Sequence, residues 1–126
     1  MFELSVTTHF SAAHRLAGYP GQCARLHGHN WEVQVYLQGP SLNDLGMLLD
    51  FREIKAALKD ALAELDHADL NELPAFMAHN PTSENIARYL YEVLARRFDA
   101  ASCRIARVSV AETPGTAAFY WNDGHR

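Results

Sequence analysis

The chain has 126 residues, of which 48% are hydrophobic and 21% charged, with a formal net charge of −4 at pH 7. This composition is typical of one globular domain spanning residues 1–126, and the acidic balance argues against a nucleic-acid binder that neutralises phosphates. No apolar run approaches the length of a membrane span, the first residues lack the pattern of a signal peptide, and two cysteines are too few for a disulfide framework. We therefore expect a cytoplasmic protein without nucleic-acid or membrane partners.

The first part of the chain is predicted to form strands. Alternating apolar residues indicate one strand over residues 2–10, with Phe2 on its core face, and a second over about residues 29–38. Residues 46–49 (GMLL) are typical of a short strand or of a turn.

Two helices follow in the middle of the chain. Asp50 is the predicted N-cap of the first, whose apolar stripe begins at Phe51 and whose end is expected at residues 65–67. The second is expected to begin at Thr82 or Ser83 as its cap, because Ile86, Leu90, Leu94 and Phe98 then recur at helical spacing.

After the helices, residues 104–112 and 117–121 are predicted as two more strands, separated by a Pro-Gly turn signal. Ala106 and Glu112 are expected on the buried face of the first of them. Helices placed in the middle of a mainly antiparallel set of strands indicate an α+β fold.

Residues 23–29 (CARLHGH) concentrate side chains that can bind a metal. His27 and His29 project to one side of an extended chain, and His14 is the third donor if its strand pairs beside theirs. Three nitrogen ligands suit Zn²⁺ and leave its fourth position for water or substrate. The spacing therefore predicts an open zinc site, against the alternative that the seven histidines cluster by chance.

Further residues allow more than one interpretation. Cys23 could be a fourth zinc ligand, a nucleophile or base beside the metal, or an inert buried thiol. Asp66 and His67 could form an acid–base pair or only terminate a helix. Glu112 is costly on a buried face unless it binds something, but is solvated if the strand ends there. Surface or packing roles are assigned to the other residues of these types: His9, His79, His125 and Cys103.

Six motifs of this chain occur in the same order and with about the same spacing in a known family. They are residues 10–14 (FSAAH), 23–29 (CARLHGH), 46–51 (GMLLDF), 65–71 (LDHADLN), 80–85 (NPTSEN) and 110–113 (VAET). From Phe2 to about Tyr120 the chain thereby resembles the 6-pyruvoyl-tetrahydropterin synthase family. The three residues between Cys23 and His27 resemble its bacterial branch, the 6-carboxy-tetrahydropterin synthases of queuosine (7-deazapurine) biosynthesis. The Pro-Gly pair at 114–115 is a local departure, and the tail from residue 121 has no counterpart.

The resemblance implies a tunnelling fold, an antiparallel sheet with two helices packed on one face. Such chains form trimeric barrels that pair into homohexamers, with active sites between subunits. It also implies that His14, His27 and His29 bind one Zn²⁺ per subunit.

The resemblance further implies a lyase acting on 7,8-dihydroneopterin triphosphate. Cys23 would accept a proton, Asp66 and His67 would form its relay, and Glu112 would anchor the pterin ring. The products would be 6-carboxy-5,6,7,8-tetrahydropterin, acetaldehyde and triphosphate. Two alternatives stay open: formation of 6-pyruvoyl-tetrahydropterin on the same fold, and a non-enzymatic binding module. The latter could be stabilised by zinc or hold no metal.

Overall fold

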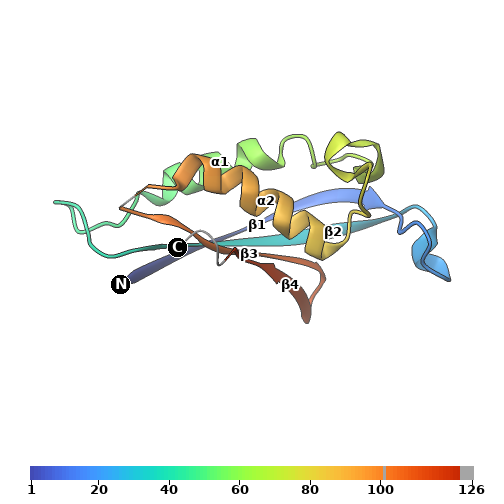
Figure 1. Ribbon diagram of the computed structural model, residues 1–126, viewed down its shortest axis with the longest axis horizontal. Coiled ribbons are helices and arrows are strands. Elements are labelled where there is room, and N and C mark those ends of the chain that lie inside the picture. Colours follow the sequence, from blue (N-terminus) through green and yellow to red (C-terminus); the bar gives the residue numbers. More distant parts are fainter. Residues whose placement is uncertain (101, 123–126) are drawn as a thin grey trace.

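The computed structural model, which describes residues 1–100 and 102–122, is built around one antiparallel sheet. Its four strands follow one another in chain order: β1 (Phe2–His14), β2 (His27–Gly39), β3 (Arg104–Thr113) and β4 (Thr116–Tyr120). The two long helices, α1 (Phe51–Leu62) and α2 (Ser83–Phe98), lie on the same face of this sheet (Figure 1). The predicted α+β fold is therefore confirmed. No helix among the described residues is long and apolar enough to cross a membrane.

The first two strands are longer than predicted. Their ladder runs without interruption from Phe2 opposite Gly39 to His14 opposite His27. The small residues Ala12 and Ala13 interrupt the apolar alternation by which a strand is recognised, but the hydrogen bonds of the backbone ladder do not depend on side-chain size. This extension brings the predicted metal ligands of both strands to one end of the sheet.

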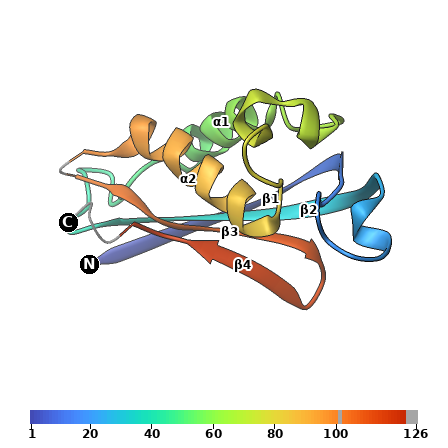
Figure 2. The ribbon, with the colours of Figure 1, turned by 45° about the vertical axis from the view of Figure 1, so that its right-hand side comes forward.

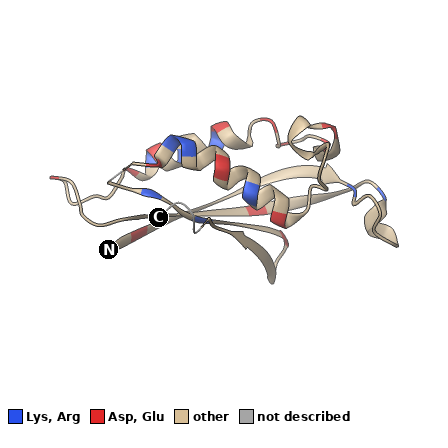
Figure 3. Ribbon diagram, in the orientation of Figure 1, with Lys and Arg blue, Asp and Glu red and all other residues tan. Residues whose placement is uncertain are grey.

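The hydrophobic core lies between the sheet and the two helices. Its largest fully buried members are Trp31, Leu37, Ile54, Leu58, Leu65, Leu70, Ile86, Leu90 and Leu94. Phe2 and Phe51, predicted on the core faces of their elements, are instead 45% and 48% exposed, because each is the first residue of its element. The Lys, Arg, Asp and Glu residues gather more densely on α1 and α2 than on the strands (Figure 3).

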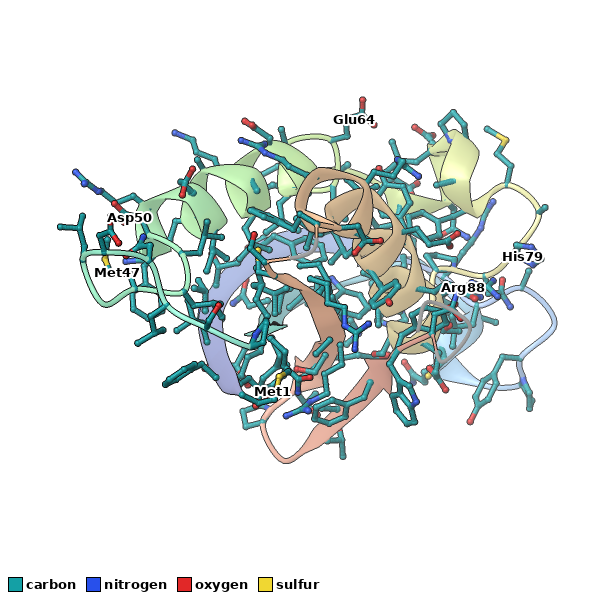
Figure 4. The ribbon with its side chains drawn as sticks, turned by 60° about the vertical axis from the view of Figure 1, so that its left-hand side comes forward. Met1, Met47, Asp50, Glu64, His79 and Arg88 are labelled. Carbon is teal, nitrogen blue, oxygen red and sulfur yellow. The ribbon has the colours of Figure 1, made fainter. Side chains whose placement is uncertain are left out.

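The start of α1 is as predicted. Asp50 caps it by accepting a hydrogen bond from the backbone N–H of Arg52 at 2.9 Å. Residues 46–49 form the turn that leads into the helix rather than a strand, and Gly46 takes the positive φ of 80° that this turn requires. Figure 4 shows Met47 and Asp50 together at this end of the helix.

The end of α1 was predicted too late. The helix stops at Leu62, so Leu65, Asp66 and His67 lie in the turns that follow. Leu65 is nevertheless fully buried, which is why the apolar spacing continued through it. His67 adopts a positive φ of 61°, and its N–H donates to the carbonyl of Ser11 in β1. The chain thus leaves the helix to pair with the edge of the sheet.

Two smaller details complete the frame. Thr82, not Ser83, caps α2, because its hydroxyl oxygen accepts the N–H of Asn85 at 3.1 Å. In β3 the register shifts opposite Tyr36 and Leu37, so that Ile105 rather than the predicted Ala106 is buried. A bulge of this kind changes which residues share a face, and alternation alone does not reveal it.

Candidate metal and pterin site

Three histidines meet where β1 ends and β2 begins. His14 and His27 are direct partners in the ladder, and His29 lies two residues further along β2. One ring nitrogen from each lies within 4.8 Å of the others. All three face the helix side of the sheet, above the buried Trp31, whose ring centroid is 4.8 Å from that of His14. Strand register alone therefore assembles the predicted set of ligands.

Hydrogen bonds fix which nitrogen of two rings is available. The Nδ1 of His14 lies 2.7 Å from the carbonyl of Pro81, and the Nδ1 of His27 lies 2.7 Å from that of Arg25. A carbonyl oxygen only accepts, so each Nδ1 carries a proton and each Nε2 presents a lone pair. Backbone carbonyls orient metal-binding histidines in the same way.

Burial disfavours the charged forms of His14 and His29 and leaves one nitrogen of each ring without a partner in the described structure. Desolvation lowers the pKa of His14 and of His29, which favours the neutral ring that a metal ion needs. The Nε2 atoms of these two rings are buried without a hydrogen-bond partner in the described structure. Buried polar atoms without partners are costly and rare, so the donor set fits a bound cation.

Glu112 lies beside this cluster. Its Oε2 is 3.3 Å from the Nε2 of His29, a close contact that is not a hydrogen bond, and its Oε1 accepts weakly from the Ser83 hydroxyl at 3.4 Å. A carboxylate at this distance favours positive charge at the Nε2 of His29, which a proton or a metal ion would supply. Glu112 is thus on the inner face, as predicted, and its side chain is 34% exposed.

A cavity of about 820 Å³ connects His29 and Glu112 to solvent. It lies between the start of β2 and the β3–β4 turn, where β2 has no partner in β3 before Glu32. Asn30 and Thr113 also line it. The cavity offers room for a small polar molecule beside the histidine cluster.

Asp66 and His67 form an exposed pair on the outer edge of β1. Their side chains are 45% and 81% exposed, and the Nδ1 of His67 lies 3.0 Å from Oδ1 of Asp66. The same oxygen accepts the backbone N–H of Ser11 at 2.9 Å. The hydrogen bond from Ser11 is the main cause that lowers the pKa of Asp66 below its usual value, and the contact with His67 lowers it further. These contacts orient the pair, and both side chains are open to solvent.

Cys23 lies in the loop between the two strands, in a short 3₁₀ helix, η1 (Gln22–Ala24), and is half-buried. Within the described chain, the group of metal-ligating atoms consists of the three histidines and does not include its sulfur. Figure 2 shows this loop and the segment after α1 at the same end of the molecule.

The remaining histidine assignments hold where the structure describes them. His9 and His79 are exposed, and Figure 4 shows His79 at the surface. Cys103 is buried, and burial raises the pKa of its thiol, as expected for an inert cysteine. His125 lies outside the described residues. Sequence reasoning missed the Pro81 carbonyl, since a backbone acceptor leaves no mark in side-chain patterns.

Comparison with known proteins shows which family has this sequence and fold. A sequence profile described as 6-pyruvoyl tetrahydropterin synthase matches residues 3–123. The chain is 36% identical over 118 residues to the 6-carboxy-5,6,7,8-tetrahydropterin synthase of a Synechocystis species, covering 90% of this chain and 88% of that protein. It is 31% identical over 126 residues to the Bacillus subtilis protein of the same name, covering 94% and 84%.

The fold agrees with these sequence relatives. The structure of Caenorhabditis elegans 6-pyruvoyl tetrahydropterin synthase superimposes with a TM-score of 0.86 at 29% identity, over 97% of this chain and 96% of the other. The chain belongs to the 6-pyruvoyl tetrahydropterin synthase family.

Proposed function

We propose that this protein is a zinc-dependent 6-carboxy-5,6,7,8-tetrahydropterin synthase of queuosine biosynthesis. Its substrate would be 7,8-dihydroneopterin triphosphate, and its products 6-carboxy-tetrahydropterin, acetaldehyde and triphosphate. The names of the relatives in the preceding comparison support this activity, as do the three residues between Cys23 and His27. The observation that carries it is the cluster of three histidines with two buried, unpaired Nε2 atoms.

His14, His27 and His29 would hold the zinc ion. Neutral imidazole nitrogens are ligands that zinc prefers, and three of them leave a position open. When bound, zinc would act as a Lewis acid that polarises the hydroxyl groups of the substrate side chain.

The protein's own groups would move the protons. Cys23, as a thiolate, would take a carbon-bound proton of the substrate. His67 would transfer a second proton, since its Nδ1 contact with Asp66 fixes one tautomer and leaves Nε2 free. Glu112, which lines the cavity beside His29, would accept hydrogen bonds from the amino and ring N–H groups of the pterin.

The solvent exposure of Asp66 and His67 supports an assembly in which another copy of the chain encloses these side chains. β1 and β4 are the outer strands of the sheet, and the segment after α1 covers the edge of β1 near Ser11 and Ala13. Strand edges that stay open favour association. Closing these edges between copies into a trimeric barrel, and pairing two barrels, would give a homohexamer.

Two alternatives make different predictions. A 6-pyruvoyl-tetrahydropterin synthase would release triphosphate without acetaldehyde, and a relative of that name shares the fold. A zinc-stabilised binding module would bind metal and convert nothing.

The test is to incubate the purified, zinc-loaded protein with 7,8-dihydroneopterin triphosphate and to identify the pterin by mass spectrometry. We expect 6-carboxy-tetrahydropterin together with acetaldehyde and triphosphate. A pyruvoyl product would select the first alternative, and an unchanged substrate would contradict the enzyme.

A further inference from the structure

Beyond His14 the chain keeps the hydrogen bonds of a strand, but side chains supply them. The backbone N–H of Arg15 donates to Oδ1 of Asn71 at 2.8 Å, and its carbonyl accepts from Nδ2 of Asn71 at 3.0 Å. Two residues on, Ala17 makes the same pair of bonds with Asn80, at 3.0 Å and 3.0 Å. Each amide thus replaces the backbone of a neighbouring strand residue. A flipped amide would face donor to donor, so the orientations are fixed.

The two asparagines are themselves anchored. Asp69 accepts the backbone N–H of Asn71 at 3.1 Å. The carbonyl of Asn80 accepts from Nδ2 of Asn85, in the first turn of α2, at 2.8 Å. Pro81, the next residue, accepts from the ring of His14. The segment between the helices therefore grips the chain from His14 to Ala17.

This grip extends to Cys23. Leu16, between the two gripped residues, donates its N–H to the carbonyl of Cys23 at 2.8 Å. The loop around it is exposed at Arg15 and from Ala17 to Gln22, so little apolar burial holds it in place. Segments of this kind open readily unless polar contacts restrain them.

We propose that Asn71 and Asn80 are positioning residues that act through the backbone of Arg15 and Ala17 to hold Cys23 in its working place. We name the two side chains the asparagine clamp. The inference rests on the proposed function, in which Cys23 accepts a proton. A displacement of about 1 Å can cost about a hundredfold in rate, so a loose loop would reduce turnover more than substrate binding.

The experiment compares Asn71→Ala and Asn80→Ala with Asn43→Ala. Asn43 is a matched control, because its Oδ1 also accepts two backbone N–H groups, those of Leu45 and Met47, but in the turn before α1. Asn71→Asp and Asn80→Asp keep the acceptor and nearly the same shape while losing the donor, so they remain informative where an alanine variant does not fold.

Four quantities are measured on the full-length protein: hydrogen exchange over residues 15–25, alkylation of Cys23 by iodoacetamide relative to the buried Cys103, zinc content, and kcat with KM. The clamp variants should exchange and alkylate about five- to tenfold faster, as expected for the loss of one or two hydrogen bonds. Their kcat should fall about 10- to 100-fold with zinc retained and KM nearly unchanged. Asn43→Ala should match the parent in all four, and the aspartate variants should also exchange and alkylate faster than the parent, because a carboxylate oxygen would face the backbone carbonyl that the amide group served.

Unchanged exchange and alkylation in the clamp variants would overturn the proposal, as would a loose loop with parental kcat. If the parent itself converts no substrate, the proposed function fails separately. Exchange and alkylation then test the clamp without kinetics. Rates in the clamp variants that exceed those in Asn43→Ala would support the clamp, and rates equal to those in Asn43→Ala would refute it.

Discussion

The two histidine-containing sites of this protein differ in how complete they are within one chain. The His14, His27 and His29 cluster packs against Trp31 and the Pro81 carbonyl, and the Nε2 atoms of His14 and His29 have no hydrogen-bond partner in the described structure. Asp66 and His67 are already hydrogen-bonded or paired, yet they face solvent. The first site groups three side chains that could hold a metal ion within one chain. The second is oriented by hydrogen bonds within the chain, and both of its side chains are open to solvent.

This contrast makes metal binding and turnover separable. The ligands come from strand register, which a single chain determines. In the proposed mechanism, proton transfer would depend on the loop that carries Cys23 and on the solvent-exposed pair of Asp66 and His67. Substitutions should therefore divide into those that remove the metal and those that spare it.

The largest effect is expected for His27→Ala. The cluster would keep two imidazoles, and the group of clustered ligand atoms in the described chain includes no fourth residue, so zinc affinity should fall by orders of magnitude. Metal analysis of the purified variant measures this. His67→Ala is the control and should retain full zinc; full zinc in His27→Ala would contradict the assignment.

Cys23→Ala is expected to lower turnover by about 10²–10⁴-fold, the usual contribution of a proton-transfer group. Zinc content should equal that of the parent, because the sulfur is not among the clustered ligand atoms. Cys103→Ala, at the other, buried thiol, is the matched control. Simultaneous loss of zinc and of thermal stability in Cys23→Ala would make this residue a ligand instead.

The floor of the cluster should matter for stability. Trp31 is fully buried, and its Nε1–H donates to the carbonyl of Ala12 at 3.2 Å. Trp31→Ala should destabilise the protein by about 3–5 kcal/mol through the cavity it leaves. Urea unfolding of the metal-free protein measures this, and Trp121→Ala, at an exposed tryptophan, should have little effect. Equal losses of unfolding free energy in Trp31→Ala and Trp121→Ala would show that Trp31 does not stabilise the fold beneath the histidine cluster.

The smallest effect concerns Asp66 and pH. Its folded pKa lies below the usual 3.8, so its ionised form contributes stability above pH 3.8 that is lost as the pH falls through the folded pKa. Asp66→Asn should therefore unfold at lower urea than the parent at pH 7, and the difference should narrow below pH 3.8. A difference that is constant over this range would show that the carboxylate's charge contributes nothing.

Much of this molecule could be predicted from its sequence, and the failures have physical reasons. Spacing identified His27 and His29 because a strand places alternate residues on one side, and His14 joined them on the expectation that its strand pairs beside theirs. It misjudged the end of α1 because Leu65 is buried whether or not its backbone is helical. The bulge at Ala106 depends on pairing with β2, and the grip of Asn71 and Asn80 depends on contacts more than fifty residues apart in the chain. Such pairings are set by the fold rather than by local pattern.

The measurement that tests the account most directly is X-ray absorption at the zinc edge of the purified protein. An open three-histidine site predicts nitrogen and oxygen neighbours at about 2.0–2.1 Å and no sulfur. A sulfur neighbour at about 2.3 Å would place Cys23 on the metal, close the fourth position and contradict the open site that the proposed reaction requires.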